Sequence, residues 1–238
     1  MEENRYERHF LLEGFGRDGQ KKLADAKVLI VGVGGLGSPV AMYLASAGIG
    51  KLGLIDADVV DVTNLQRQII HSESSVGVDK VISAKQRISE LNSETEVVTY
   101  NFFFDKNNAD SIAKDYDFIV DCADNNRTKF LINDVCVRLR KPFCHGSITE
   151  YSGRVFTHLP STACYRCLFD EEDEPPAKRG VLGASVGIIG SIQATEVIKY
   201  FTGIGDLLTN SLLTLDVRTL KFLKFKIRTS AKCSCNDI

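Results

Sequence analysis

The sequence predicts an α/β protein whose parallel β-sheet is extended by antiparallel strands toward the C-terminus. In the first 140 residues, short apolar runs alternate with longer segments that repeat apolar residues at helical spacing. This alternation is typical of a parallel sheet. After residue 140, apolar runs follow one another more directly, which indicates antiparallel strand pairs.

Each expected strand is a short run rich in Val, Ile, Leu or Phe, and each expected helix carries apolar residues on one face. The expected strands lie at about 27–32, 52–56, 97–100, 118–121, 143–149, 154–158, 212–217 and 220–226. The expected helices lie at about 35–47, 81–91, 130–139 and 185–201.

The length of 238 residues suits a single domain over 1–238. Within it we expect a nucleotide-binding part at 1–160 and a C-terminal part at 161–238. The segment 170–180 is charged and contains two prolines, so we expect a mobile loop there.

The composition excludes several classes of partner. Formal net charge is −2, from 29 basic and 31 acidic side chains, so the chain has no general attraction for nucleic acid or an anionic membrane. The polar N-terminus lacks the apolar core of a signal peptide. We therefore expect a cytoplasmic protein with no nucleic-acid or membrane partner, whose seven cysteines serve as thiols rather than disulfides.

The motif Gly32-Val-Gly-Gly-Leu-Gly37 follows an expected strand and opens an expected helix. Glycines allow a tight turn and close approach to a ligand, and a helix N-terminus offers free N–H groups to phosphate. Asp56 ends the next strand, where a carboxylate can bind ribose hydroxyls. This pattern predicts a Rossmann-like fold that binds a nucleotide, NAD or ATP, through Gly34, Gly35, Gly37 and Asp56.

The residues after Asp56 favour ATP. Asp58, Asn64 and Arg67 precede Lys80, which begins a helix. Nucleotidyl transfer increases the negative charge on the α-phosphate and the leaving pyrophosphate. Arg67 and Lys80 are candidates to neutralise this charge.

Asp124 follows the expected strand at 118–121, at the sheet edge where ligands bind in open α/β sheets. It could hold Mg²⁺, with Asn125 nearby. The alternative interpretation is that Arg67, Lys80 and Asp124 are ordinary surface charges.

The pairs Cys164-Tyr-Arg-Cys167 and Cys233-Ser-Cys235 predict a structural zinc site that joins the C-terminal segment to the body of the protein. Four thiolates would leave no open position on the metal, so no catalytic metal is expected there. Three further cysteines, Cys122, Cys136 and Cys144, are expected to pack in the core.

A hydrolase remains a weak alternative, because Gly183-Ala-Ser-Val-Gly187 matches a G-x-S-x-G nucleophile elbow. Such an elbow must follow a buried strand. A proline-rich charged segment precedes this one, so Ser185 is expected to begin a helix instead.

Together these motifs resemble the MoeB/ThiF/HesA family, bacterial relatives of the ubiquitin-activating enzymes. The resemblance extends from Arg5 to the C-terminal cysteines. It rests on Arg5-Tyr-Glu-Arg8, Gly32 to Gly37, Asp56-Ala-Asp58, Asn64-Leu-Gln-Arg67-Gln, Lys80, Asp121-Cys-Ala-Asp-Asn125 and Cys164-Tyr-Arg-Cys167.

The resemblance implies an adenylyltransferase that uses ATP and Mg²⁺. Its substrate would be a ubiquitin-like sulfur-carrier protein, whose C-terminal Gly-Gly becomes an acyl-adenylate as pyrophosphate leaves. By position, Gly35 would approach the nucleotide and Asp56 would bind the ribose. Arg67 and Lys80 would contact the phosphates, and Asn64 would support them. Asp124 would bind the metal. The resemblance also implies a homodimer in which Arg8 reaches the partner's nucleotide.

One departure from the family concerns the loop at 170–180. Several relatives carry a cysteine there that bonds the carrier covalently, but this loop has none. We therefore expect adenylation without a covalent link through this loop, and sulfur transfer by another protein. The pathway, molybdopterin, thiamine or another, stays open.

Three other hypotheses for the function stay open. Adenylation of a peptide or tRNA-linked carboxylate is one, although Cys164 and Cys167 and the low basicity argue against tRNA. An NAD-dependent oxidoreductase is the second. The third is a scaffold that binds a ubiquitin-like partner without turning over ATP.

Overall fold

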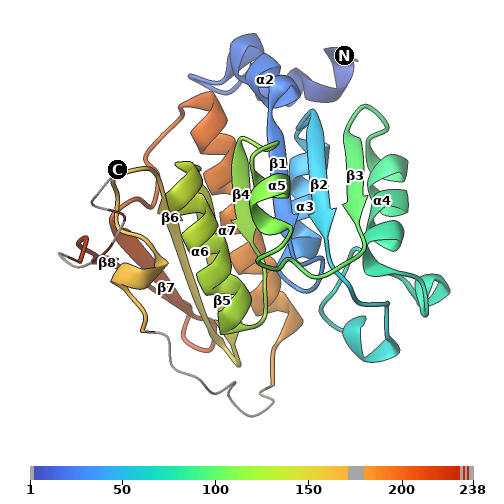
Figure 1. Cartoon of the computed structure of the whole chain (residues 1–238). Helices are drawn as coiled ribbons and strands as arrows, with labels where there is room; N and C mark the ends of the chain where they lie inside the picture. The colour runs from blue at the N-terminus through green and yellow to red at the C-terminus, as the bar shows by residue number, and fades with distance from the viewer. Residues whose placement is uncertain (1–2, 171–179, 231–232, 234, 236–238) are drawn as a thin grey trace.

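The computed structural model describes residues 3–170, 180–230, 233 and 235. Eight strands form one sheet in the order β3-β2-β1-β4-β5-β6-β7-β8 (Figure 1). The strands from β3 to β5 in this order are parallel, and β5 to β8 pair antiparallel, which confirms the predicted fold class. The strands are β1 Lys27–Val31, β2 Lys51–Ile55, β3 Glu96–Tyr100, β4 Phe118–Asp121, β5 Phe143–Thr149, β6 Ser152–His158, β7 Ser211–Asp216 and β8 Lys221–Lys226.

Helices cover both faces of the sheet, because alternate residues of a strand point to opposite faces. Val28 and Ile30 of β1 pack in one core with α3, α4 and α7, whereas Leu29 and Val31 pack in a second core with α5 and α6. The helices are α1 Glu7–Phe10, α2 Gly16–Asp25, α3 Gly37–Ser46, α4 Lys80–Leu91, α5 Ala109–Ala113, α6 Asn126–Leu139 and α7 Gly183–Thr202. Short 3₁₀ helices are η1 Glu3–Tyr6, η2 Val62–Asn64, η3 Glu73–Ser75 and η4 Tyr165–Cys167.

The predicted strands agree with the observed ones within one or two residues. Helix α6 begins at Asn126, four residues before the predicted start at 130, because the Asn125 side chain accepts a hydrogen bond from the Thr128 N–H and caps it. Helices α1, α2 and α5 were not predicted. Ser185 lies inside α7 and is fully buried, so the nucleophile-elbow alternative is wrong.

Three cysteines pack in the core, as predicted. Cys122 and Cys144 belong to the core on the α7 side, and Cys136 belongs to the core on the α6 side. Burial raises the pKa of all three thiols. They are therefore poor nucleophiles at neutral pH.

The chain passes from β1 to β2 to β3 on one side of β1, then returns to place β4 on its other side (Figure 1). Ligands of open α/β sheets bind at the carboxyl ends of the strands, at such a reversal. The segments that leave this edge after β1, β2 and β4 contain most of the predicted site residues.

No described helix is both long enough and apolar enough to cross a membrane. The predicted mobile loop at 170–180 lies largely outside the described residues, since they omit 171–179. The sheet continues across residue 160, so the two predicted parts share it.

Candidate nucleotide-binding site

The glycine-rich loop turns from β1 into α3 through a space that has no room for side chains at three positions, Gly32, Gly35 and Gly37. A Cβ on Gly37 would lie 2.1 Å from the Gly32 carbonyl oxygen. A Cβ on Gly35 would lie 2.9 Å from Val186 Cγ1 on α7 and 3.7 Å from Arg67 Cγ. The loop backbone is thus closely packed between α7 and the segment that carries Arg67.

Asp56 holds the glycine-rich loop to the end of β2. Its Oδ2 accepts a hydrogen bond of 2.8 Å from the Val33 N–H, and its Oδ1 accepts one of 2.9 Å from the Asp58 N–H. Burial raises the pKa of this carboxyl group, and the nearby Lys80 opposes that rise. Each oxygen has a further lone pair, so a carboxylate in this position can also accept from a ribose hydroxyl.

Lys80 begins α4, and its Nζ lies 2.7 Å from Oδ2 of Asp58. The backbone N–H of Lys80 also donates to the Asp58 carbonyl, at 2.9 Å. Because the lysine side chain is 7% exposed, packing directs its ammonium toward this edge of the sheet.

The turn at 61–68 places Asn64 and Arg67 near the same edge. Oδ1 of Asn64 accepts from the Asp61 N–H, and the Arg67 guanidinium donates to the Thr63 carbonyl at 3.1 Å. Helix α7 packs closely on this turn, since a Cβ on Gly183 would lie 2.4 Å from the Gln66 carbonyl oxygen.

Asp124 and Asn125 lie in the turn between β4 and α6. Both are exposed, and Nδ2 of Asn125 donates to Oδ1 of Asp124 at 3.3 Å. Carboxylate and amide oxygens are the hard ligands that Mg²⁺ prefers, so an exposed carboxylate at this edge fits that ion.

Two buried clusters of polar side chains, which no sequence motif indicates, lie close to this edge of the sheet. His71 is buried, and its Nδ1 and Nε2 lie 2.9 Å from Ser83 Oγ and 3.1 Å from the Val33 carbonyl. Burial lowers the pKa of His71, so the neutral ring donates to Val33 and ties α4 to the glycine-rich loop. Asp121, Lys129 and His145 form a second buried cluster.

Arg8 lies at the opposite end of the sheet. It is exposed on α1, and its neighbour Tyr6 is buried beside Gly48 and Asn92, which come just before β2 and β3. Figure 1 shows the N-terminal helices at the end where the parallel strands begin. A five-residue strand is about 17 Å long, so Arg8 is more than a side-chain length from the glycine-rich loop of its own chain.

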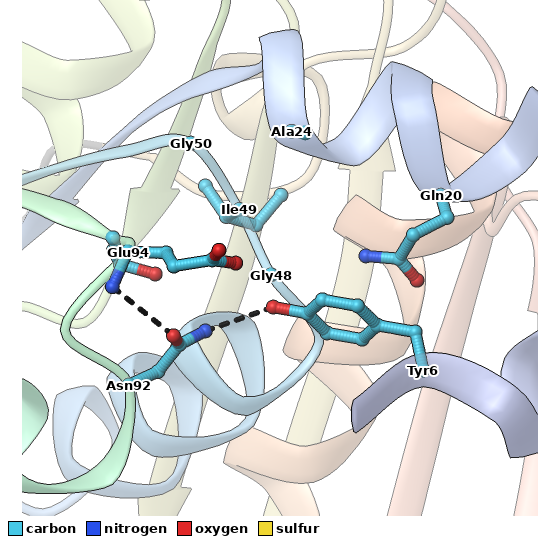
Figure 2. A pocket seen from close by; sticks show the side chains of 9 residues that line it. Tyr6, Gln20, Ala24, Gly48, Ile49, Gly50, Asn92 and Glu94 are labelled. Atoms are coloured by element: carbon cyan, nitrogen blue, oxygen red, sulfur yellow. Dashed lines mark hydrogen bonds between the residues drawn. The ribbon is translucent and has the colours of Figure 1, made fainter. Parts of the chain in front are cut away.

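The N-terminal segment is anchored at a small cavity of about 70 Å³ (Figure 2). There the Tyr6 hydroxyl accepts a hydrogen bond of 3.0 Å from Nδ2 of Asn92. Gln20 also lines the cavity and contacts Nδ1 of His9 at 2.8 Å. These contacts hold the backbone on both sides of Arg8 and leave the Arg8 side chain exposed.

The four cysteines of the predicted zinc site meet. Their Sγ atoms all lie within 4.8 Å of one another. Sγ of Cys164 is 3.3 Å from Sγ of Cys233, and Sγ of Cys167 is 3.4 Å from Sγ of Cys235. The Ser230 N–H donates to Sγ of Cys167. Four sulfurs at this spacing fit tetrahedral thiolate coordination of zinc, at about 2.3 Å per Zn–S bond.

The molecule thus combines an open α/β sheet, a glycine-rich loop at its reversal point and a cysteine cluster near its C-terminus. The ThiF family model matches residues 6–237, and the chain therefore belongs to the ThiF family. This finding confirms the resemblance drawn from the motifs.

Curated relatives are longer than this chain. The chain is 44% identical over 242 residues to the adenylyltransferase and sulfurtransferase MOCS3 of Culex quinquefasciatus, covering 98% of the chain and 55% of that protein. It is 43% identical over 235 residues to MOCS3-1 of Zea mays, covering 95% of the chain and 50% of that protein. The chain therefore spans about half the length of these relatives.

Solved structures share the fold. E. coli MccB in a structure with ATP superposes with a TM-score of 0.89 at 27% identity, covering 99% of this chain and 74% of that chain. A structure of E. coli MccB with MccA-N7isoASN gives a TM-score of 0.88 at the same identity, covering 99% and 75%.

Proposed function

We propose that this protein is an adenylyltransferase that joins AMP to the C-terminal Gly-Gly carboxylate of a ubiquitin-like sulfur-carrier protein and releases pyrophosphate. One observation carries the proposal: the glycine-rich loop, Lys80, the Arg67 segment and the Asp124 turn all lie at the carboxyl edge of β1, β2 and β4. Membership of the ThiF family and similarity to proteins named adenylyltransferases support it.

In this proposal the protein positions charges rather than supplying a base. The carrier carboxylate is already a nucleophile at neutral pH, so its attack on the α-phosphate needs no proton transfer. Backbone N–H groups of the glycine-rich loop hold the phosphates, and Lys80 and Arg67 neutralise the charge that develops as pyrophosphate leaves. Asp56 orients the ribose, and Asn64 supports the turn that carries Arg67. In-line placement supplies much of the rate.

Mg²⁺ would be held by Asp124, with Asn125 beside it and Asp58 close to the same edge. Bound there, Mg²⁺ would stabilise charge on the triphosphate. The four cysteines would hold a structural zinc ion within the C-terminal part, 161–238, where it joins the segment with Cys233 and Cys235 to Cys164 and Cys167. This part and the nucleotide-binding part, 1–160, would form one domain.

The proposed assembly is a homodimer in which Arg8 reaches the nucleotide of the partner subunit. The position of Arg8 at the amino end of the sheet supports this arrangement, because the side chain is too far from the glycine-rich loop of its own chain. An exposed arginine on an anchored backbone can reach a neighbouring subunit.

ATP–pyrophosphate exchange tests the proposed function. It should depend on a carrier that ends in Gly-Gly, and it should disappear in Asp124→Ala. Exchange with a short peptide instead would favour a peptide carboxylate, the alternative that the fold shared with MccB keeps open. Tight NAD binding without exchange would favour an oxidoreductase, and carrier binding without exchange would favour a scaffold.

A further inference from the structure

Lys129 spans the turn that carries Asp124. Its backbone N–H, in the first turn of α6, donates to the Asn125 carbonyl at 3.3 Å. Its Nζ lies 3.1 Å and 3.3 Å from the two carboxylate oxygens of Asp121, the last residue of β4. One residue therefore contacts both ends of the segment 121–125.

The Asp121 carboxylate is buried, and each of its two oxygens accepts more than one hydrogen bond. Its Oδ1 also accepts from the Ala123 N–H at 3.1 Å, and its Oδ2 accepts from Nδ1 of His145 at 2.6 Å. Only 1% of the Asp121 side chain is exposed. The bond to Ala123 links the carboxylate directly to the residue that precedes Asp124.

The surroundings of Asp121, Lys129 and His145 determine which of these three groups carry a charge. His145 lies among aromatic rings, with ring centroids 4.8 Å from Tyr165 and 5.3 Å from Phe156. Burial lowers the pKa of His145 to about 4, so the neutral ring donates its Nδ1 proton to Asp121. The Lys129 ammonium is thus the cation that balances the Asp121 carboxylate, and it also donates to the Gly146 carbonyl at 2.9 Å.

A second contact holds Asp121 from the opposite face of the sheet. Gln193 of α7 is fully buried, and its Nε2 donates to the Asp121 carbonyl at 2.9 Å and to the Cys144 carbonyl at 3.3 Å. The end of β4 is therefore held to β5 through both the main chain and the side chain of Asp121.

A buried ion pair is often no more stabilising than apolar side chains of the same size. What distinguishes this pair is that it also binds the backbone of the turn before Asp124. We propose that Lys129 and His145 are positioning residues, which hold the Asp121 carboxylate so that the 122–125 turn presents Asp124 to Mg²⁺–ATP. This inference rests on the proposed function, since it assumes that Asp124 serves the nucleotide site.

Calorimetric titration with ATP, with and without Mg²⁺, tests the inference without relying on turnover. Lys129→Met should weaken Mg²⁺–ATP binding about tenfold, because a small displacement of one ligand is costly at a preorganised site. Metal-free ATP should bind with an affinity within about twofold of wild type, since the glycine-rich loop and Lys80 are unchanged. Lys129→Arg should restore most of the affinity, and Arg138→Met, an exposed cation on the same helix, is the matched control.

Lys129→Met leaves a buried carboxylate without its cation and could fail to fold. Two double variants avoid that charge. Asp121→Asn with Lys129→Met keeps an oxygen that can accept from the Ala123 N–H, whereas Asp121→Leu with Lys129→Met does not. The first should bind Mg²⁺–ATP more tightly than the second, with similar affinities for metal-free ATP.

The inference would be overturned if Mg²⁺ changed the affinity for ATP equally in Lys129→Met and Arg138→Met. It would also be overturned if Mg²⁺ changed this affinity equally in the two double variants. Equal loss of metal-free and Mg²⁺-dependent binding would also overturn it, because that result indicates a general structural role. Wild-type protein that binds ATP but never exchanges pyrophosphate would instead overturn the proposed function, which separates the two failures.

Discussion

The Lys80 ammonium and the Asp58 carboxylate form an ion pair of 2.7 Å at the carboxyl edge of β2. The two partners differ in exposure: the Lys80 side chain is 7% exposed and the Asp58 side chain is 59% exposed. Packing therefore holds the lysine in place, while the carboxylate is free to turn toward solvent. We expect Lys80 to exchange Asp58 for a phosphate oxygen when ATP binds.

Lys80→Met should lower the rate of ATP–pyrophosphate exchange by about a hundredfold, because it removes a preorganised cation from the developing phosphate charge. Lys85→Met on the same helix is the control, since Lys85 is exposed. Initial rates at saturating carrier measure the effect. Equal rates in the two variants would show that Lys80 is a structural partner of Asp58.

Mixed dimers test the role of Arg8. Homodimers of Arg8→Ala and of Asp124→Ala should both be inactive, whereas a purified heterodimer of the two should regain about half of the wild-type exchange rate, since one of its two sites is intact if Arg8 acts in trans. Thermal denaturation of Arg8→Ala should match wild type, because Arg8 is exposed. An inactive heterodimer would indicate that Arg8 does not act across the interface.

Removal of the metal should destabilise the C-terminal part. We expect one zinc ion per chain by elemental analysis, and Cys235→Ser should lose this ion and lower the Tm by at least about 5 °C. Cys136→Ala, a core cysteine outside the cluster, should retain the metal whatever its stability. A wild-type chain purified without zinc, and unaffected by chelators, would exclude the zinc site.

Stability should fall as the pH decreases from about 6.5 to about 4. The His145 pKa is lowered to about 4 in the folded protein by burial and by Lys129, so the unfolded chain binds the proton over this range and is favoured. The Asp121 pKa is also lowered, so its contribution is lost at lower pH as the carboxylate is protonated.

Urea midpoints between pH 7 and pH 4 measure this slope. His145→Gln retains a donor for Asp121 and should give a shallower slope than wild type. Some slope should remain, because burial also lowers the pKa of His71 and His158. An unchanged slope would show that His145 is not among the groups responsible.

Local patterns predicted most of the fold. The runs at β1, β2 and β4 are short and apolar, and the glycines after β1 identify the turn into α3. Helix α1 was missed because four residues are too few to show a helical period. The start of α6 was missed because its first turn, Asn126-Arg-Thr-Lys129, is polar, and the Asn125 cap identifies it only once the backbone is known.

The predicted nucleotide-site residues other than Arg8 lie on segments at one sheet edge, but their roles stay predictions. His71, Lys129 and His145 gave no signal in the sequence. A buried histidine or lysine in an amphipathic segment looks like any other polar residue until its partner is known. Their partners are 38, 8 and 24 residues away in the chain, at Val33 for the first and Asp121 for the others.

The sequence by itself determined the order of the strands and of helices α3, α4, α6 and α7, the glycine-rich turn and the two cysteine pairs, because each depends on residues close together in the chain. Only the tertiary structure decided that β4 lies beside β1, that the two cysteine pairs meet, that Arg8 lies at the far end of the sheet and that Lys129 binds Asp121. These relationships depend on which strands become neighbours. That choice follows from packing two apolar faces of one sheet at once, which no single segment encodes.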